Sequence, residues 1–316
     1  MSREQRAKID AMLRAPRPQN PDPASVEEIR SGFAAMMATM IVPEGIRTAP
    51  ATLGPRPALL VEPVDRPRAG TILYFHGGSF VFGSPETALS LTGNLVTGTG
   101  FRAYSLDYRL APEHPFPAAI EDALAAYRAL LDAGEDPAAI AFAGDSAGGG
   151  LTVTTCLAAR AAGLPLPAAI VAFSPGLDGT RTGESMDTRA AADPLLTREG
   201  LERTGAMYLA GQDPHQELIS PALLADLTGF PPMLLQVGTN EVLLDDSTRL
   251  AARARAAGVD VILDVTADVP HVFQAFTGVL DEADQALARA AFFLTQHVRA
   301  SDTPGTSDSR PGPYRG

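Results

Sequence analysis

The stretch Gly144-Asp145-Ser146-Ala147-Gly148 stands between a strand-like run, 140–143, and a helical pattern over 147–162. A G-x-S-x-G motif at a strand-to-helix junction is typical of a nucleophile elbow, where small residues allow a strained turn that exposes the serine hydroxyl at a sheet edge. The positive end of the helix would also face an anion forming beside Ser146. We therefore predict that Ser146 is a nucleophile; the alternative is a chance match in a chain rich in glycine and alanine.

Short apolar runs alternate with helical patterns on both sides of this elbow. The predicted strands are 58–61, 71–75, 101–106, 140–143, 169–173, 233–237 and 259–265, and the predicted helices are 117–131, 147–162, 198–209, 245–257 and 282–298. Such alternation predicts an α/β fold with a mostly parallel central sheet and helices on both faces. Sheets of this kind bind their ligands beyond the carboxyl ends of the strands.

The first 45 residues read as a helical cap segment. Ser2-x-x-Gln5 and Ser25-x-x-Glu28 both have the form of a capping box, and the prolines between them predict an extended connector. After the second box, apolar residues recur at helical spacing and are expected to cover the core on one side and to roof a substrate pocket on the other. They are Ile29, Phe33, Met36, Met37 and Met40.

The remaining chain divides into a catalytic domain and a tail. Residues 46–299 form the predicted catalytic domain, with a further contribution to the cap near 178–215. Residues 300–316 are rich in Ser, Thr, Pro and Gly and have almost nothing to bury, so they predict a disordered tail.

Composition excludes several classes of function. The 316 residues include 25 Lys and Arg against 37 Asp and Glu, a net charge of −12 that disfavours nucleic acid and strongly anionic substrates unless a local arginine overrides it. The single cysteine, Cys156, provides neither an intrachain disulfide nor a zinc cluster and is expected to pack in the core. No stretch of about 20 apolar residues predicts a membrane span, and no secretory signal is evident, so we expect a cytoplasmic protein. The expected chemistry implies no metal or organic cofactor.

A glycine loop follows the predicted strand 71–75. His76-Gly77-Gly78 allows backbone N–H groups to approach a ligand closely, and several such donors can converge on one oxygen. We predict that the N–H groups of Gly77, Gly78 and Ala147 form an oxyanion hole and that Phe80 lines the substrate pocket. A plain turn is the alternative, whereas the chain has neither of the glycine motifs that bind nucleotide phosphates.

A serine nucleophile needs a general base, and the chain has five histidines. His76 is tied to the glycine loop, His114 lies in a proline-rich run and His297 lies in the last helix, which leaves His215 and His271. The latter follows the last predicted strand and completes the chain order nucleophile, acid, base. We therefore predict that His271 is the base.

The orienting carboxylate is expected in the loop after the predicted strand 233–237. That loop has three acids, of which Glu241 comes first, while Asp245 and Asp246 fit the cap of the next helix. Their positions favour Glu241 and leave the other two open.

Together these motifs resemble the hormone-sensitive-lipase-like branch of the α/β-hydrolases, the bacterial family IV esterases, from about residue 58 to 298. The chain matches the family's HGG motif at 76–78, its DYRLAPE segment at 107–113 and its GDSAGG elbow at 144–149. The resemblance implies an α/β-hydrolase fold, with the leading helices in the cap. It also supports Ser146, Glu241 and His271 as the catalytic residues, and dimers through the last strand and helix are common in the family.

Two departures from the family pattern are Ser79, where a third glycine is usual, and Glu241, where Asp is more common. Neither removes a required group. Within the matched segment, Asp107, Arg109 and Glu113 are expected to form a structural ion network rather than a binding site, because buried charges are tolerated only when paired.

The expected function is therefore that of a serine carboxylesterase acting through an acyl-enzyme on small, neutral, short- to medium-chain esters. Lactones are a second possible substrate, since the N-terminal segment and residues 238–247 look most like esterases named monoterpene lactone hydrolases. An amidase, deacetylase or acyltransferase would use the same residues, and a ligand-binding module on the same fold is the alternative from another class.

Overall fold

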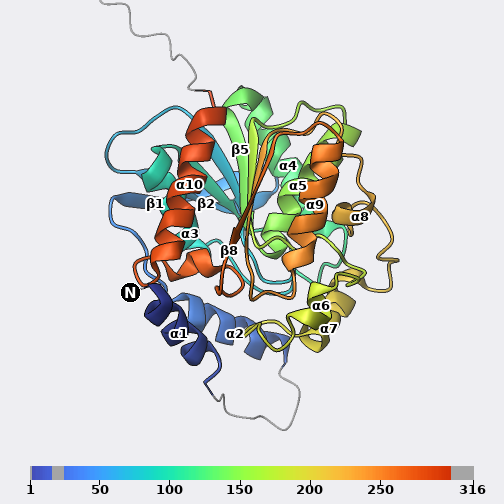
Figure 1. Cartoon of the computed structure of the whole chain (residues 1–316). Helices are drawn as coiled ribbons and strands as arrows, with labels where there is room; N and C mark the ends of the chain where they lie inside the picture. The colour runs from blue at the N-terminus through green and yellow to red at the C-terminus, as the bar shows by residue number, and fades with distance from the viewer. Residues whose placement is uncertain (1, 16–24, 300–316) are drawn as a thin grey trace, which may run out of the picture.

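The computed structural model describes residues 2–15 and 25–299 (Figure 1). Within them, eight strands form one sheet in the order β1-β2-β4-β3-β5-β6-β7-β8. The strands are β1 Ile46–Leu53, β2 Arg56–Pro63, β3 Thr71–Phe75, β4 Arg102–Leu106, β5 Ile140–Asp145, β6 Ala169–Phe173, β7 Met233–Gly238 and β8 Val261–Thr266. Strand β2 runs antiparallel to β1 and β4, and the other pairs are parallel, as the sequence predicts.

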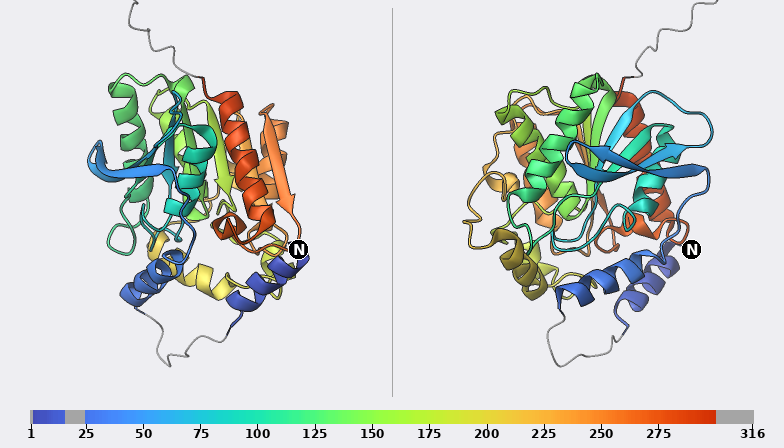
Figure 2. Two further views of the ribbon diagram at one scale, coloured as in Figure 1. Left: turned by 90° about the vertical axis from the view of Figure 1, so that its left-hand side faces the viewer. Right: turned by 180° about the vertical axis from the view of Figure 1, so that it is seen from behind.

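Helices cover both faces of the sheet, and Figure 2 shows the layers edge-on. One face packs against α3 Leu89–Thr99 and α10 Asp281–His297, and the other against α4 Ala118–Asp132, α5 Ala147–Ala161 and α9 Leu244–Ala256. Side chains alternate along a strand, so in β3 Ile72 and Tyr74 face the first layer while Leu73 and Phe75 face the second. Every residue of β3 and β5 is buried, which accounts for their apolar sequences.

The parallel register brings the candidate site segments to one edge. Phe75 pairs with Gly144, and Phe173 pairs with Asp145, so the loops after β3, β5 and β6 begin side by side. The loops after β7 and β8 start at the same edge because those strands pair from Met233–Val261 to Gly238–Thr266. Cys156, on α5, is fully buried in the core, as predicted.

Four helices lie together over that edge, at the lower end of Figures 1 and 2. They are α1 Ser2–Leu13, α2 Val26–Met37, α6 Ser185–Thr188 and α7 Arg198–Leu209. The elements that remain are α8 Pro221–Leu224 and two 3-10 helices, Pro137–Ala139 and Phe273–Phe276. The division into a cap, 1–45 with 178–215, and a catalytic domain, 46–299, remains our proposal, and the predicted tail, 300–316, lies outside the described residues.

Of the two predicted capping boxes, one forms and the other does not. The second capping box forms, with Ser25 and Glu28 bonded to each other's backbone N–H. The first does not, because Ser2 lies inside α1, where its hydroxyl donates to Glu282 and the Gln5 amide donates to Asp281. The longer elements β1 and α3 were not predicted, nor were the short helices α6 and α8 and the two 3-10 helices. No helix in the described part of the chain has the length and apolar character needed to cross a membrane.

Candidate active site

Ser146 occupies the sharp turn between β5 and α5. Its backbone is left-handed, with φ 52° and ψ −118°, a strained conformation for a residue with a side chain. The turn closes only because its flanking residues are glycines: a Cβ on Gly148 would lie 2.0 Å from the carbonyl oxygen of Phe75, and one on Gly144 would lie 2.5 Å from that of Gly148. The elbow is thus pressed directly against β3.

His271 lies in the loop after β8, beside the elbow. Its Nε2 atom is 2.8 Å from the Oγ atom of Ser146, and its Nδ1 atom is 2.8 Å from Oε2 of Glu241. Because an ionised carboxylate only accepts hydrogen bonds, Nδ1 carries the proton and Nε2 is left to accept from the serine hydroxyl. The imidazole is therefore oriented to withdraw the serine proton.

Glu241 is fully buried at the end of β7. Its Oε1 atom accepts hydrogen bonds from the Ser174 hydroxyl, at 2.8 Å, and from the Gly238 N–H. Burial raises the pKa of Glu241 above its usual value, although the bonds from His271 and Gly238 oppose that rise. Burial would lower the pKa of His271, but the bond and charge of Glu241 outweigh it, so the pKa of the imidazole is raised.

Ser174 is a residue of the site that the sequence did not reveal. It follows β6 with φ 46°, donates to Glu241 and accepts from the N–H of Val272 at 3.0 Å. It thereby joins the loop with the carboxylate to the loop with the imidazole. The only available signal was its place after a strand that neighbours both β5 and β7.

The glycine loop after β3 lies beside the elbow. Gly78 has φ 123°, and a Cβ there would lie 2.0 Å from the Phe82 carbonyl oxygen, while one on Gly77 would lie 2.2 Å from the Asp145 carboxylate. The backbone of Gly77 faces the Asp145 carboxylate, and it opposes the rise that burial causes in the pKa of Asp145. Ala147 begins α5, where the first N–H groups have no partner within the helix.

Buried polar side chains support the glycine loop from behind. Tyr108 stacks on His76, with ring centroids 4.2 Å apart, and its hydroxyl donates to the carbonyl of His76 at 2.7 Å. Tyr74 donates to Asp145 at 2.9 Å. Burial lowers the pKa of His76 to about 4 and raises that of Asp145 to about 6. His76 is thus neutral and structural, as its place in the motif suggested.

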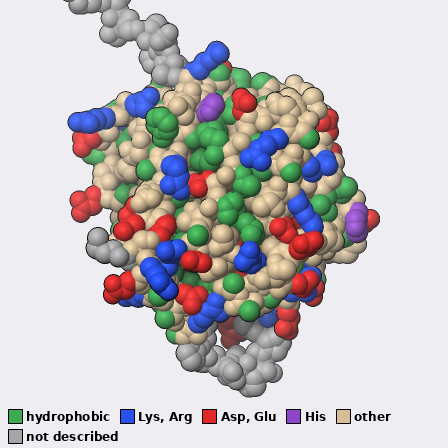
Figure 3. All heavy atoms as spheres, viewed as in Figure 1, with side chains coloured by type: hydrophobic (Ala, Val, Ile, Leu, Met, Phe, Trp, Pro, Cys, Tyr) green, Lys and Arg blue, Asp and Glu red, His purple; other side chains and the backbone are tan. Residues whose placement is uncertain are grey.

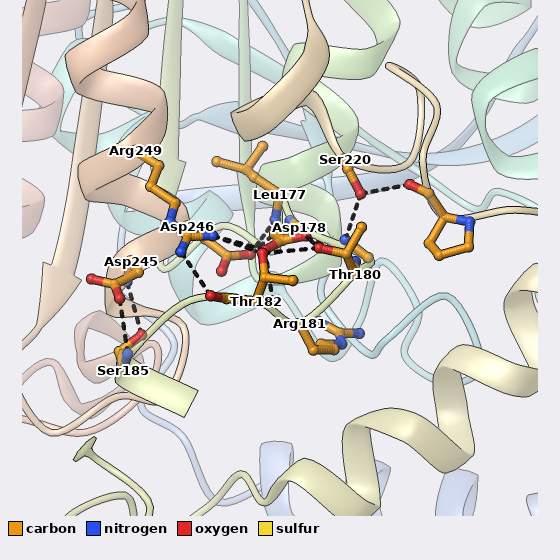
Figure 4. A network of polar contacts seen from close by, with 12 residues as sticks. Leu177, Asp178, Thr180, Arg181, Thr182, Ser185, Ser220, Asp245, Asp246 and Arg249 are labelled. Carbon is orange, nitrogen blue, oxygen red and sulfur yellow. Dashed lines mark hydrogen bonds and ion pairs between the residues drawn. The ribbon is translucent and has the colours of Figure 1, made fainter. Parts of the chain in front are cut away.

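The other predicted candidates lie elsewhere. His215 is exposed beside Asp213. Asp245 and Asp246 lie in the first turn of α9 and not at its N-cap, which is Leu243. Asp246 accepts from the N–H groups of Leu177 and Asp178, at 2.6 and 2.9 Å, and Asp245 accepts from that of Ser185 (Figure 4). Both carboxylates hold backbone N–H groups within residues 177–185, and neither bonds to His271.

The DYRLAPE segment is held by ion pairs, but these are not the single network that was expected. Arg109 pairs with Asp122 and Glu121, at 2.9 and 3.0 Å. Glu113 instead pairs with Arg30 of α2, at 2.6 Å, which lowers the pKa of Glu113 to about 2. Arg30 also donates to the carbonyl groups of Val81 and Ala111, so it fastens α2 to the body.

A cavity of about 310 Å³ opens beside Ser146. Phe80 lines it, whereas Phe33, Met36, Met37 and Met40, which were also expected at the pocket, do not. The ring of Phe33 instead packs on Phe82, 4.8 Å between centroids, and Met37 and Met40 pack against the core. The apolar wall is completed by residues that the sequence did not single out, namely Leu201, Tyr208, Leu209, Ile219 and Leu243.

Comparisons with known proteins agree with this architecture. A family described as having the alpha/beta hydrolase fold matches residues 72–275. The chain is 46% identical over 224 residues to an acetyl-hydrolase of Streptomyces hygroscopicus, covering 71% of this chain and 75% of that protein. It also superposes on an esterase from the bacterial hormone-sensitive lipase family, with a TM-score of 0.88, 42% identity and coverage of 94% and 99%. The esterase EstE5, in crystals soaked with p-nitrophenyl butyrate, gives a TM-score of 0.88, 39% identity and coverage of 93% and 98%.

Proposed function

This chain belongs to the α/β-hydrolases, in their hormone-sensitive-lipase branch, and is a carboxylic ester hydrolase; we propose that it works as a serine esterase through an acyl-enzyme. The observation that carries the proposal is the pair of 2.8 Å contacts that join Ser146 to His271 and His271 to Glu241. The strained elbow holds the hydroxyl in position, so little ordering is needed when an ester arrives.

In the first half of the reaction, the Ser146 oxygen attacks the ester carbonyl while His271 takes its proton at Nε2. Glu241 stabilises the imidazolium that results. The tetrahedral oxyanion is held by the N–H groups of Gly78 and Ala147, with that of Gly77 beside them. His271 then protonates the leaving alcohol, and the acyl group remains on Ser146.

In the second half, water replaces the alcohol. His271 removes a proton from this water, which attacks the acyl carbonyl, and the same N–H groups hold the second oxyanion. Collapse of that intermediate breaks the bond to Ser146, and the proton on His271 returns to the serine oxygen. The carboxylic acid leaves and the resting site is restored.

The proposed substrates are small, neutral esters of short to medium chain length, or lactones. The 310 Å³ cavity is walled largely by apolar side chains, and it lies at the lower end of the range for sites that enclose small molecules. The acetyl-hydrolase name of one relative and the butyryl ester soaked into EstE5 support the same range of chain lengths.

The test combines a covalent probe with a substrate series. A fluorophosphonate should label the native protein at Ser146 and should not label Ser146→Ala. With p-nitrophenyl esters of increasing chain length and a set of lactones, kcat/KM should be highest for short acyl chains. Intact protein that neither labels nor hydrolyses any member would refute the serine mechanism, and a preference for chains beyond about ten carbons would refute the small pocket.

The proposed homodimer would form through the free edge of β8 and the outer face of α10. Apolar side chains gather over β8 in Figure 3. Ile262 and Val265 on β8 are 53% and 42% exposed, and Phe292 on α10 is 64% exposed. A free strand edge flanked by apolar groups favours pairing with another copy. Light scattering should show a dimer that Ile262→Lys converts to a monomer; a native monomer at micromolar concentration would refute it.

A further inference from the structure

One cationic side chain that the mechanism does not use, Arg181, lines the cavity beside Ser146. Arg181 lies in the loop between β6 and α6 and lines the same cavity as Ser146 and Phe80. Its backbone is left-handed, with φ 56°, a conformation that costs free energy for a residue other than glycine. Its N–H donates to the carbonyl of Asp178 and its own carbonyl accepts from Arg198, so the backbone is fixed on both sides.

The guanidinium of Arg181 has no hydrogen-bonding or ion-pair partner among residues 2–15 and 25–299, in contrast to its neighbours. Arg249 pairs with Asp178 at 3.2 Å, and Arg198 pairs with Asp187 at 2.9 Å. In Figure 4 the side chain of Arg181 points away from the bonded cluster around Asp246. The charge of Arg181 acts on Asp246 only at longer range, where it lowers a pKa that burial raises to about 7.

Helix α7 leaves room for this guanidinium. Gly205 lines the cavity opposite the loop, and a Cβ there would lie 3.8 Å from Nη2 of Arg181. Any longer side chain at this position would enter the space beside the guanidinium. A glycine inside a helix lowers helix stability by about 1 kcal/mol relative to alanine, so the space beside the guanidinium is kept at that cost.

Two carboxylates also line the cavity, and neither neutralises Arg181. Asp178 accepts from the backbone and hydroxyl groups of Thr180 and Thr182 as well as from Arg249, so its oxygens are satisfied. Glu202 is exposed on α7 and forms no ion pair with Arg181. A half-buried guanidinium that faces an apolar cavity without a counter-ion is poorly solvated, and a bidentate carboxylate is the partner that best fits its geometry.

We propose that Arg181 binds a carboxylate on the substrate, so that the enzyme accepts esters with a free carboxylate at the end remote from the scissile bond. This inference rests on the proposed serine esterase and adds an anionic class to its neutral substrates. The net charge of −12 works against such substrates at long range, but within the cavity the contact with Arg181 outweighs a field that salt screens over about 8 Å.

Two matched substrate pairs test the proposal on either side of the scissile bond. Monoethyl adipate and diethyl adipate carry or lack the charge on the acyl side, and 4-acetoxybenzoate and its methyl ester carry or lack it on the alcohol side. For each pair the readout is the ratio of kcat/KM for the acid to kcat/KM for the neutral ester. In Arg181→Gln this ratio should fall about 10- to 100-fold for one pair, mainly through a higher KM for the acid.

Variants of charge separate this role from a structural one. Arg181→Lys should recover part of the ratio, and Glu202→Gln should raise it, because it removes a negative charge from the cavity wall. Arg255→Gln, at the exposed far end of α9, makes the same change in net charge and should leave the ratio and the basal activity unchanged.

The outcomes distinguish the two levels of the proposal. If neutral esters are hydrolysed through Ser146 but Arg181→Gln leaves the ratio unchanged in both pairs, the carboxylate site is refuted and the serine esterase stands. A parallel loss for acid and neutral ester would show that Arg181 only supports Asp246, which also refutes the site. If the native protein hydrolyses p-nitrophenyl esters but none of these four esters, the carboxylate site is refuted and the serine esterase stands. If it neither labels at Ser146 nor hydrolyses any ester, the proposed function fails and the inference fails with it.

Discussion

The Nδ1 atom of His271 lies 2.8 Å from Oε2 of Glu241, and the carboxylate that receives this contact has no exposed surface. The glutamate can take part only as a fixed acceptor, because its other oxygen is already bonded to Ser174 and Gly238. The side chain of Glu241 therefore reaches the imidazole although it is one methylene longer than the aspartate that the family resemblance leads us to expect.

Removal of either reacting side chain should abolish most of the activity. We expect Ser146→Ala and His271→Ala each to lower kcat by about 10⁴- to 10⁶-fold, and the double variant to be no worse than either, since the two residues act as a unit. The measurement is steady-state kinetics on a p-nitrophenyl ester. Circular dichroism verifies that each variant is folded. Losses that multiply in the double variant would contradict a shared step.

The acid limb of the pH profile of kcat/KM reports the titration of the His271 imidazole. Because the base must be neutral, kcat/KM should rise with pH through the pKa of His271, which lies above its ordinary value of 6.5. Glu241→Gln removes the charge that raises this pKa and leaves the burial that lowers it, so the limb should move to lower pH. The plateau should fall about 10⁴-fold. An unshifted limb in this variant would show that Glu241 does not face the imidazolium.

Ser174→Ala should damage both stability and rate. It leaves the N–H of Val272 unpaired and withdraws one donor from Glu241, which should cost about 1–3 kcal/mol in the free energy of unfolding. Displacement of the Glu241 carboxylate should lower kcat by up to about 10²-fold.

The matched control is Ser105→Ala, which removes a buried hydroxyl that has no hydrogen-bond partner among the described residues and should be nearly neutral. Urea denaturation and kcat measured on both variants separate the two effects. Equal losses in the two would mean that the Ser174 hydroxyl contributes packing alone.

Gly77→Ala should disturb the oxyanion donors. The added Cβ would lie 2.2 Å from the Asp145 carboxylate, so the loop must move, and kcat should fall by about 10²- to 10³-fold. Gly32→Ala, in α2 with open space around it, should instead keep full activity and stabilise the protein by up to about 1 kcal/mol. A fully active Gly77→Ala would exclude this loop from the reaction.

Sequence reasoning succeeded where a single segment carried its own signal. Ser146 and Glu241 follow apolar runs that form the buried strands β5 and β7, and His271 follows the half-exposed edge strand β8. The topology of parallel sheets then brings the loops after these strands to one edge. The structure does bring these three side chains into contact, and their catalytic roles remain the proposal to be tested.

The elements that escaped prediction lack such signals. Strand β1 is an exposed edge that includes Arg47 and Pro50, so it shows no apolar alternation. In α3 the buried face carries hydroxyls such as those of Thr92 and Thr99, which bond to carbonyls of the preceding turn and hide the helical period. The roles of Ser174 and Arg181 depend on contacts with residues that are distant in the chain. No local sequence pattern predicts such contacts.

Phe75 pairs with Gly144 in parallel register, so the glycine loop and the elbow begin at paired positions of two neighbouring strands. Their spacing is therefore a property of the main chain and is independent of what lies above them. The roof, the helices α1, α2, α6 and α7 above that edge, can therefore be exchanged without changing the spacing between the glycine loop and the elbow. Chimeras that graft a relative's roof onto this sheet should accordingly acquire its selectivity while they keep this chain's turnover chemistry.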